Sequence, residues 1–296
     1  MTNATLRGVI AAIATPVDDG GEPDLARLVE HARSLLDDGC DGLNLLGTTG
    51  EATSFSIEQR LRVMDGVAAA GLPLGRMMVG TGAAACADAL GLTRAAARLG
   101  FAGALVLPPF YYKPVKAEGL VAYIGALVEA TSDSALPIYL YNFPALSGIA
   151  YTPAIVGRLI ERFGDRIAGL KDSSGDLDYA GQIAALSPGL AVFPSNEGTL
   201  LQAREGPFAG CISATANLNA RDCAAAYRTG DGAALYRAVR VRSLFTDLPL
   251  VPGIKAELAR RTGDPAWARM VAPLVGLDDS ESRTLGARVA ALAGPG

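Results

Sequence analysis

The sequence predicts an α/β protein, a (β/α)8 TIM barrel with an appended C-terminal helical region. Short apolar runs that end in Gly, Pro, Thr or Asn alternate with longer stretches of helical period, which is typical of parallel βα units. Eight such runs occur, 20 to 34 residues apart, so each unit has room for one strand and one covering helix. The runs begin near Gly8, Gly42, Arg76, Gly103, Pro137, Ile167, Leu190 and Gly210.

The length of 296 residues fits one barrel followed by additional helices. A single barrel commonly takes about 250 residues, and its closed sheet leaves no unpaired edge; a doubly wound open sheet is the alternative. After about Tyr227 the strand pattern stops, and apolar residues at helical spacing run through 233–244, 251–259 and 285–292. No Gly/Ser linker precedes them. We therefore expect the barrel over residues 1–228 and a helical region over residues 229–296 packed on it.

The composition is that of a globular protein without a nucleic-acid partner. Half of the residues are hydrophobic and 19% are charged, which is enough apolar surface for a large closed core. The net charge is only -4, and the basic residues are dispersed rather than clustered. A protein that binds a phosphate backbone needs a basic patch, so nucleic acid is not an expected partner.

Neither a membrane segment nor a disulfide framework is indicated. No run approaches the roughly 20 apolar residues that a membrane helix needs. The apolar stretch 9–14 is too short for a signal peptide and is interpreted as the first strand. The cysteines are far apart and form no CxxC pair, which argues against a zinc site and fits a reducing cytoplasm. They are Cys40, Cys86, Cys211 and Cys223.

The first candidate catalytic residue is Lys171, because only four residues of the chain are lysines and this one lies in the apolar run IAGLKDSS. The run is the predicted sixth strand, and barrel enzymes carry their reacting groups at the C-terminal ends of strands. Burial favours the neutral amine that Schiff-base chemistry requires. A salt bridge to Asp172 is the alternative, but neighbouring side chains of a strand point to opposite faces.

Two further sequence features are expected near this lysine. Tyr141 ends the preceding strand, PIYLYN, and sequential barrel strands lie about 4.8 Å apart, so its phenol can transfer protons beside Lys171. At the end of the second strand, GTTGE at 47–51 offers two hydroxyls and successive backbone N–H groups, which suit a carboxylate. The alternatives are a core tyrosine and an ordinary strand-to-helix turn.

The sequence lacks the motifs of several other enzyme classes and binding sites. The single histidine, His31, lies in the predicted first helix, 25–36, away from any strand end, which argues against histidine catalysis and a histidine metal site. There is no GxGxxG after a strand, no GxxxxGK[ST] loop and no GxSxG elbow. The lysine itself supplies the electrophilic activation, so no cofactor and no metal are implied.

Five motifs occur in order over nearly the whole chain, and together they resemble one family. A single motif of this kind is weak, but five at matching strand ends are highly specific. The sequence resembles the dihydrodipicolinate synthase and N-acetylneuraminate lyase family, the class I, Schiff-base, pyruvate-dependent aldolases. The motifs are GTTGE at 47–51, PPFYYKP at 108–114, YNFP at 141–144, GLKDSSGD at 169–176 and GCISATAN at 210–217.

The resemblance implies roles for residues at the expected site. Lys171 forms the imine with pyruvate or a related 2-oxo acid, and Tyr141 is the proton shuttle over the bond that forms or breaks. Thr48 relays protons, the amides of Thr48 and Thr49 hold the carboxylate, and the carbonyl of Ile212 faces the bound 2-oxo acid.

The resemblance also implies an oligomer. Tyr111 matches the tyrosine that this family lends across a tight dimer into the neighbouring active site. The family is usually a dimer of dimers, so we expect a homotetramer. The expected binding partner is a small-molecule substrate, a 2-oxo acid.

Departures from the family pattern bear on the substrate. Leu146 stands where dihydrodipicolinate synthases have an arginine for the second substrate's carboxylate, unless another arginine such as Arg204 reaches that point. The wording PALSG at 144–148 is similar to the neuraminate lyases, and Glu197 would hydrogen-bond the hydroxyls of a sugar acid. GCISATAN is closer to the synthases.

We therefore expect a lyase that acts on an N-acetylneuraminate-like or 2-keto-3-deoxy sugar acid. Dihydrodipicolinate synthesis is the main alternative, and a deoxy sugar acid dehydratase is the next. A non-catalytic barrel that senses a 2-oxo acid would be expected to lose Lys171 or Tyr141, and both are present.

Overall fold

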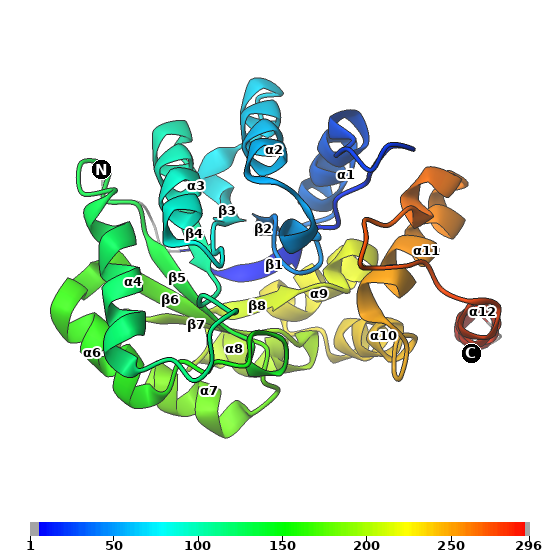
Figure 1. The fold of residues 1–296 in the computed structure, drawn as a ribbon. Helices are drawn as coiled ribbons and strands as arrows, with labels where there is room; N and C mark the ends of the chain where they lie inside the picture. Colours follow the sequence, from blue (N-terminus) through cyan, green and yellow to red (C-terminus); the bar gives the residue numbers. More distant parts are fainter. Residues whose placement is uncertain (1–5, 294–296) are drawn as a thin grey trace.

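The computed structural model describes residues 6–293 and confirms the (β/α)8 barrel. Eight parallel strands lie in the order β7-β6-β5-β4-β3-β2-β1-β8 at the centre of Figure 1. The Ala209 amide, just before β8, donates to the Val192 carbonyl of β7 at 2.8 Å and joins the two ends of the sheet. The strands are β1 (Gly8–Ala12), β2 (Gly42–Leu45), β3 (Met77–Gly80), β4 (Gly103–Val106), β5 (Ile138–Asn142), β6 (Ile167–Asp172), β7 (Ala191–Pro194) and β8 (Gly210–Ser213).

Helices surround this sheet, and each strand begins within one residue of its predicted start (Figure 1). Several of the helices begin at an aspartate, serine or threonine whose side chain accepts a hydrogen bond from the first turn. The covering helices are α1 (Leu25–Asp37), α2 (Ile57–Ala69), α3 (Cys86–Leu99), α4 (Ala117–Glu129), α6 (Pro153–Phe163), α7 (Leu177–Ala184), α8 (Leu200–Glu205) and α9 (Ala216–Thr229), with a short α5 (Pro144–Ser147) after β5.

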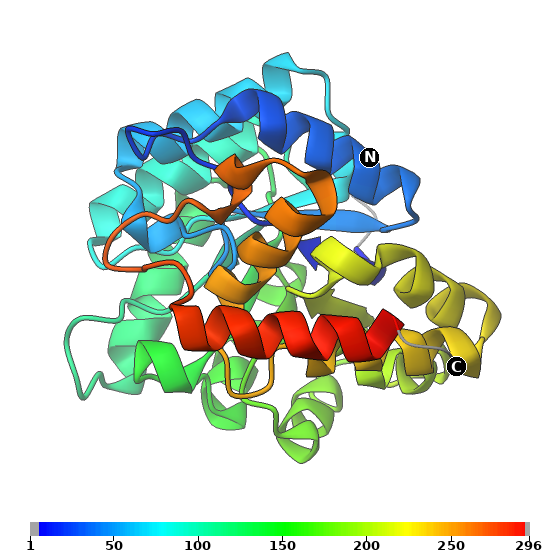
Figure 2. The same ribbon diagram turned by 90° about the vertical axis from the view of Figure 1, so that its right-hand side faces the viewer.

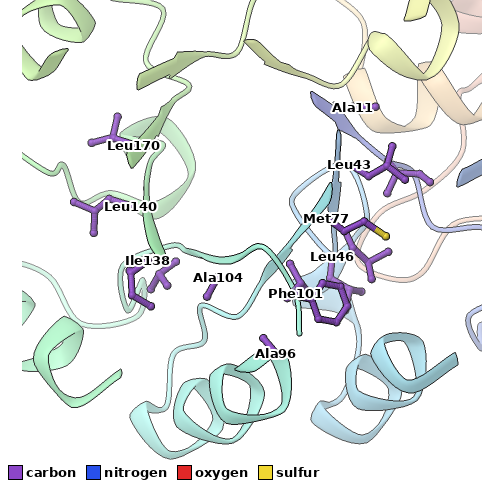
Figure 3. Packing of buried hydrophobic residues seen from close by; sticks show 14 of the residues in the cluster. Ala11, Leu43, Leu46, Met77, Ala96, Phe101, Ala104, Ile138, Leu140 and Leu170 are labelled. Carbon is purple, nitrogen blue, oxygen red and sulfur yellow. The ribbon is translucent and has the colours of Figure 1, made fainter. Parts of the chain in front are cut away.

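Both faces of the strands are buried, and alternate residues enter different cores. On β5, Ile138 and Leu140 belong to the outer core between sheet and helices, whereas Tyr139 and Tyr141 belong to the core inside the barrel. Figure 3 shows Leu140 and Leu170 in the outer core, on the register-paired strands β5 and β6. The next residue of each strand, Tyr141 and its partner on β6, therefore points into the barrel near its C-terminal end.

Three helices follow the barrel: α10 (Gly232–Ser243), α11 (Leu250–Thr262) and α12 (Asp279–Ala293). They gather on one side of the barrel in Figure 1, and Figure 2 shows α12 crossing in front of α11. A third apolar cluster joins Ile254 of α11, Leu285 of α12 and Phe245 of the turn after α10 to Ala14, which follows β1. None of the described helices is both long and apolar enough to cross a bilayer.

The start of α12 differs from the sequence expectation, which placed this helix from residue 285. The helix begins at Asp279, because the amides of Asp278 and Glu281 each donate to the other residue's carboxylate and cap the first turn. The residues of this first turn are polar, so the spacing of apolar residues gave no indication that the helix begins there.

Candidate active site

Lys171 lies inside the mouth of the barrel, where the sixth strand ends. It pairs in register with Tyr141 of β5 on one side and Phe193 of β7 on the other, and it is 4% exposed. Its Nζ lies 4.4 Å from the centroid of the Tyr141 ring. Gly169, one inward position deeper, is needed there because a Cβ would lie 2.7 Å from the ring of Tyr139. Lys171 and Tyr141 therefore lie side by side at the end of the barrel where the strands terminate.

Asp172 points away from Lys171, as strand alternation predicts. Its carboxylate accepts hydrogen bonds from Asn142 Nδ2 and from Ser174 Oγ, each at 2.8 Å. These bonds tie the ends of β5 and β6 together on the outer face. The lysine amine is therefore left to face the barrel interior and the tyrosine.

The turn GTTGE after β2 completes the floor of the site. Thr48 Oγ1 lies 3.1 Å from the Tyr141 hydroxyl, within hydrogen-bond distance. Leu46 and Glu51 have φ of 52° and 53°, a left-handed conformation that costs a non-glycine residue about 1–3 kcal/mol and is common at functional sites. Within residues 6–293, the amides of Thr48 and Thr49 donate to no other residue. Two free donors in one turn suit an anionic oxygen.

A buried ion pair supports this turn from α11. The Glu51 carboxylate accepts from Lys255 Nζ and from the amide of Val271 at 3.0 Å, and Lys255 also donates to the carbonyl of Thr15 at 3.2 Å. Both charged side chains are fully buried. Burial lowers the pKa of Lys255, and the facing charge of Glu51 opposes that shift. Nothing local in the sequence predicted this pair, because its members are 204 residues apart.

A cavity of about 710 Å³ opens above these groups and is built by the barrel together with the C-terminal helical region. Its lining combines polar side chains with apolar ones. The polar lining residues include Thr48, Thr49, Tyr141, Lys171, Ser173, Ser195 and Arg242; the others include Phe143, Leu146, Ile212 and residues 249–252 and 273–276.

Glu197 lies in a different place from the one we expected. Its side chain is fully buried and does not line the cavity. Its carboxylate accepts hydrogen bonds from Ser213 Oγ at 2.9 Å, Thr215 Oγ1, Asn219 Nδ2 at 2.9 Å and Arg242 Nη1 at 3.1 Å. The carboxylate is thus surrounded by donors of the protein itself.

Arg242, in the last turn of α10, stands in the cavity wall in front of Glu197. Sequence reasoning missed this residue and named Arg204, which does not line the cavity. The only signal for Arg242 was its spacing, four residues after the buried Ala238 on the same helix face.

Tyr111 is the one predicted catalytic residue that lies apart from the others. It is 75% exposed in the loop between β4 and α4 and does not line the cavity of its own chain. Its ring packs edge-on against that of Tyr112, with 5.2 Å between the ring centroids. His31 also lies outside the cavity, where it hydrogen-bonds Asn217 at 2.9 Å. Among the described residues, no three His, Cys, Asp or Glu side chains are grouped to hold a metal ion.

Known proteins resemble this chain over nearly its whole length. A family model described as the Dihydrodipicolinate synthetase family matches residues 5–292. The chain belongs to that family. Its members are lyases and aldolases that bind pyruvate, and this chain is a lyase of the same family.

Two curated relatives show the same membership. An uncharacterized DapA-like lyase of Chloroflexus aurantiacus is 34% identical over 94% of this chain and 94% of its own. A 4-hydroxy-tetrahydrodipicolinate synthase of Synechococcus sp. (strain CC9605) is 33% identical over 96% of this chain and 94% of its own. The motifs predicted the family from the sequence alone, and these relatives confirm it.

Solved structures agree with the fold over their full length. Dihydrodipicolinate synthase from Agrobacterium tumefaciens str. C58 superposes with a TM-score of 0.90 at 29% identity, covering 97% of this chain and 99% of that one. YagE from E. coli K12, a prophage protein of the dihydrodipicolinic acid synthase family solved in complex with pyruvate, has a TM-score of 0.88 at 25% identity, with 98% and 99% coverage.

Proposed function

We propose that this chain cleaves a sugar-acid-type 2-oxo acid, N-acetylneuraminate-like or a 2-keto-3-deoxy sugar acid, through a Schiff base on Lys171. One observation supports this above all others. The Lys171 amine lies 4.4 Å from the Tyr141 ring, and the Tyr141 hydroxyl lies 3.1 Å from Thr48 Oγ1, all on the floor of one cavity. A buried amine next to a chain of hydroxyls is what imine formation requires.

In the first step the neutral amine of Lys171 attacks the C2 carbonyl of the 2-oxo acid. The carbonyl oxygen takes a proton, the nitrogen loses one, and the resulting carbinolamine expels water to give the imine. Tyr141 gives and takes these protons, with Thr48 as its relay. The substrate carboxylate binds the amides of Thr48 and Thr49, and the carbonyl of Ile212, which lines the same cavity, faces the bound 2-oxo acid.

In the second step the imine, protonated on its nitrogen by Tyr141, accepts the electron pair of the C3–C4 bond as that bond breaks. Tyr141 removes the proton of the C4 hydroxyl, so the departing fragment leaves as an aldehyde. The enamine left on Lys171 is then protonated at C3 and hydrolysed, which releases pyruvate and restores the amine.

Tyr111 is proposed to enter this site from a second copy of the chain. Its 75% exposure and its distance from its own cavity are consistent with a role in the neighbouring site of a tight dimer. We extend this to a homotetramer built as a dimer of dimers. The four free cysteines support a cytoplasmic location.

Dihydrodipicolinate synthesis is the second candidate, because relatives that are 32–36% identical carry the name 4-hydroxy-tetrahydrodipicolinate synthase. Leu146 argues against this candidate. It lines the cavity and is 61% exposed at the position where an arginine would bind a second carboxylate. Losing about 3 kcal/mol of charge-assisted hydrogen bonding lowers kcat/KM about 100-fold.

A substrate panel separates the two candidates. We expect pyruvate release from N-acetylneuraminate or a 2-keto-3-deoxy sugar acid, followed by a coupled dehydrogenase assay, to exceed condensation of pyruvate with aspartate semialdehyde in kcat/KM. The variant Lys171→Ala is the control for background release. If the semialdehyde reaction is clearly the fastest, the protein is a synthase and the argument from Leu146 is wrong.

A further inference from the structure

We infer that Arg60 makes a small second cavity, next to the active site, a binding site for one monatomic anion of halide size. This cavity has a volume of about 30 Å³ and is separate from the large one that Lys171 lines. The inference does not depend on the proposed imine, because it concerns a buried charge that the proposed mechanism leaves unused.

Arg60 is a buried cation without a carboxylate partner. It lies on α2 and is 3% exposed. Within residues 6–293 its guanidinium donates only to two backbone carbonyls, from Nη2 to Gly80 at 2.8 Å and to Gly82 at 3.2 Å. Carbonyl dipoles orient the guanidinium but carry no net charge. Because buried charges in proteins are normally paired, a counter-charge is expected from elsewhere.

The surroundings of Arg60 confirm that its charge is poorly compensated. Burial lowers the pKa of the guanidinium to about 10, and the charge of Asp88 opposes that shift only in part. Asp88 is exposed in the first turn of α3, so solvent screens its effect. At neutral pH the guanidinium therefore keeps a positive charge that an ion in contact with it would stabilise.

Several hydrogen-bond donors around the small cavity are available to such an ion. Nε of Arg60 is buried and has no partner in the part of the chain that the structure describes. Thr48 and Tyr141, which also line this cavity, each carry a hydroxyl that can donate. A guanidinium and hydroxyl groups together form the charge-assisted donor set that an anion requires.

The size and the remaining lining of the cavity select a small ion. About 30 Å³ has room for one or two water-sized groups, since a single water needs about 10–15 Å³. An ion with several heavy atoms, such as phosphate, is too large. The other side chains of the lining are uncharged, and Leu46, Leu105 and Leu107 are apolar. A water molecule would satisfy Nε but would leave the guanidinium without a counter-charge, which favours an anion.

The cavity borders the residues of the proposed proton relay. Thr48 and Tyr141 line both cavities, whereas Lys171 lines only the large one. An ion in the small cavity would therefore accept hydrogen bonds next to the Thr48–Tyr141 pair, whose oxygens are 3.1 Å apart. The site would link halide binding to the two hydroxyls that the proposed mechanism uses.

Bromide is the probe, because it has halide size and can be located by its anomalous X-ray scattering. Thermal unfolding of the full chain is measured in sodium bromide and in sodium gluconate at equal ionic strength, since gluconate is too large for the cavity. The difference in Tm between the two salts is then compared among variants, so general effects of the salts cancel. Relative to Arg60→Met, the wild type should gain about 2–4 °C in bromide at ten times its Kd.

The variants separate ion binding from the structural role of the arginine. Arg60→Met should lose the bromide-specific gain, and Arg60→Lys should keep part of it. Arg76→Met is the matched control and should keep all of it. Arg76 also donates to two backbone carbonyls, those of Asp41 and Cys40, but it does not line the cavity.

A crystal of the wild type grown in bromide gives a second measurement that does not require any variant to fold. An anomalous peak next to Arg60 Nε is the expected result. Water without an anomalous peak in the cavity would overturn the inference, as would an equal bromide effect in the wild type and Arg60→Met. A peak without any gain in Tm would show binding at crystal concentration only and would also overturn it.

Discussion

Lys171 and Tyr141 occupy paired register positions on neighbouring strands, and this pairing is the basis of the proposed chemistry. Each side chain is nearly inaccessible to water, and each ends at the cavity rather than inside the packed barrel. The position of a side chain in the barrel matters more for the proposed chemistry than its residue type. Tyr139, two residues earlier on the same strand, is also a buried phenol, but it accepts a hydrogen bond from the amide of Leu6 and lies deeper in the barrel.

We predict that Tyr141→Phe lowers kcat by about 100-fold or more, because a positioned general acid-base group contributes about 10²- to 10⁴-fold. The measurement is steady-state pyruvate release with the best substrate of the panel. Tyr139→Phe is the control: burial raises the pKa of Tyr139 to about 12, and its loss should cost stability but leave kcat near the wild-type value. A wild-type kcat in Tyr141→Phe would remove the tyrosine from the proton transfers.

At the scale of elements, α11 and the turn after β2 are tied together by Lys255 and Glu51. The pair joins the C-terminal helical region to the backbone that offers the Thr48 and Thr49 amides. Because both charges are fully buried, removing one partner leaves the other uncompensated. We therefore regard α11 as part of the support of the active site.

Lys255→Met should lower the free energy of unfolding by about 3–5 kcal/mol, the usual effect of breaking a buried ion pair. The double variant Lys255→Met/Glu51→Gln should recover part of that loss, since no charge is then left unpaired. Urea unfolding followed by circular dichroism measures both. The exposed Lys116→Met is the control and should change stability by less than about 0.5 kcal/mol. Equal stability of the single variant and the wild type would show that the pair contributes little.

The elements themselves were largely predictable, whereas the support of the site was not. Strand starts and the inward positions of Tyr141 and Lys171 follow from local apolar runs and period-two alternation. Glu197, Arg242 and Lys255 interact with residues that are distant in the sequence. No local sequence pattern therefore predicts where their charged groups lie. Glu197 was expected to hydrogen-bond the hydroxyls of a sugar acid; its side chain is buried, and Arg242, which donates to it, lines the cavity.

At the scale of the whole molecule, Tyr111 is the residue that a single chain leaves unexplained. Its ring and that of Tyr112 are more than two-thirds exposed, and Leu146 at the cavity mouth is also exposed. Large exposed aromatic side chains on one loop favour contact with a second subunit. The proposed dimer would bring one chain's tyrosine to the other chain's lysine.

Mixing two inactive variants tests this arrangement. When Tyr111→Phe and Lys171→Ala subunits are dissociated and reassembled together, each mixed dimer should contain one intact site. At equal concentrations about a quarter of all sites should regain activity in an isologous dimer. Native mass spectrometry confirms mixing. The absence of recovery in demonstrably mixed oligomers would place Tyr111 outside its neighbour's site.

The proposed mechanism depends most directly on the imine at Lys171. Reduction with borohydride in the presence of pyruvate should add one reduced pyruvate to each chain, and peptide mapping should place it on Lys171. Lys171→Ala should show no such adduct while remaining folded by circular dichroism. An adduct that survives this substitution, or that maps to Lys113, Lys116 or Lys255, would contradict the proposed mechanism.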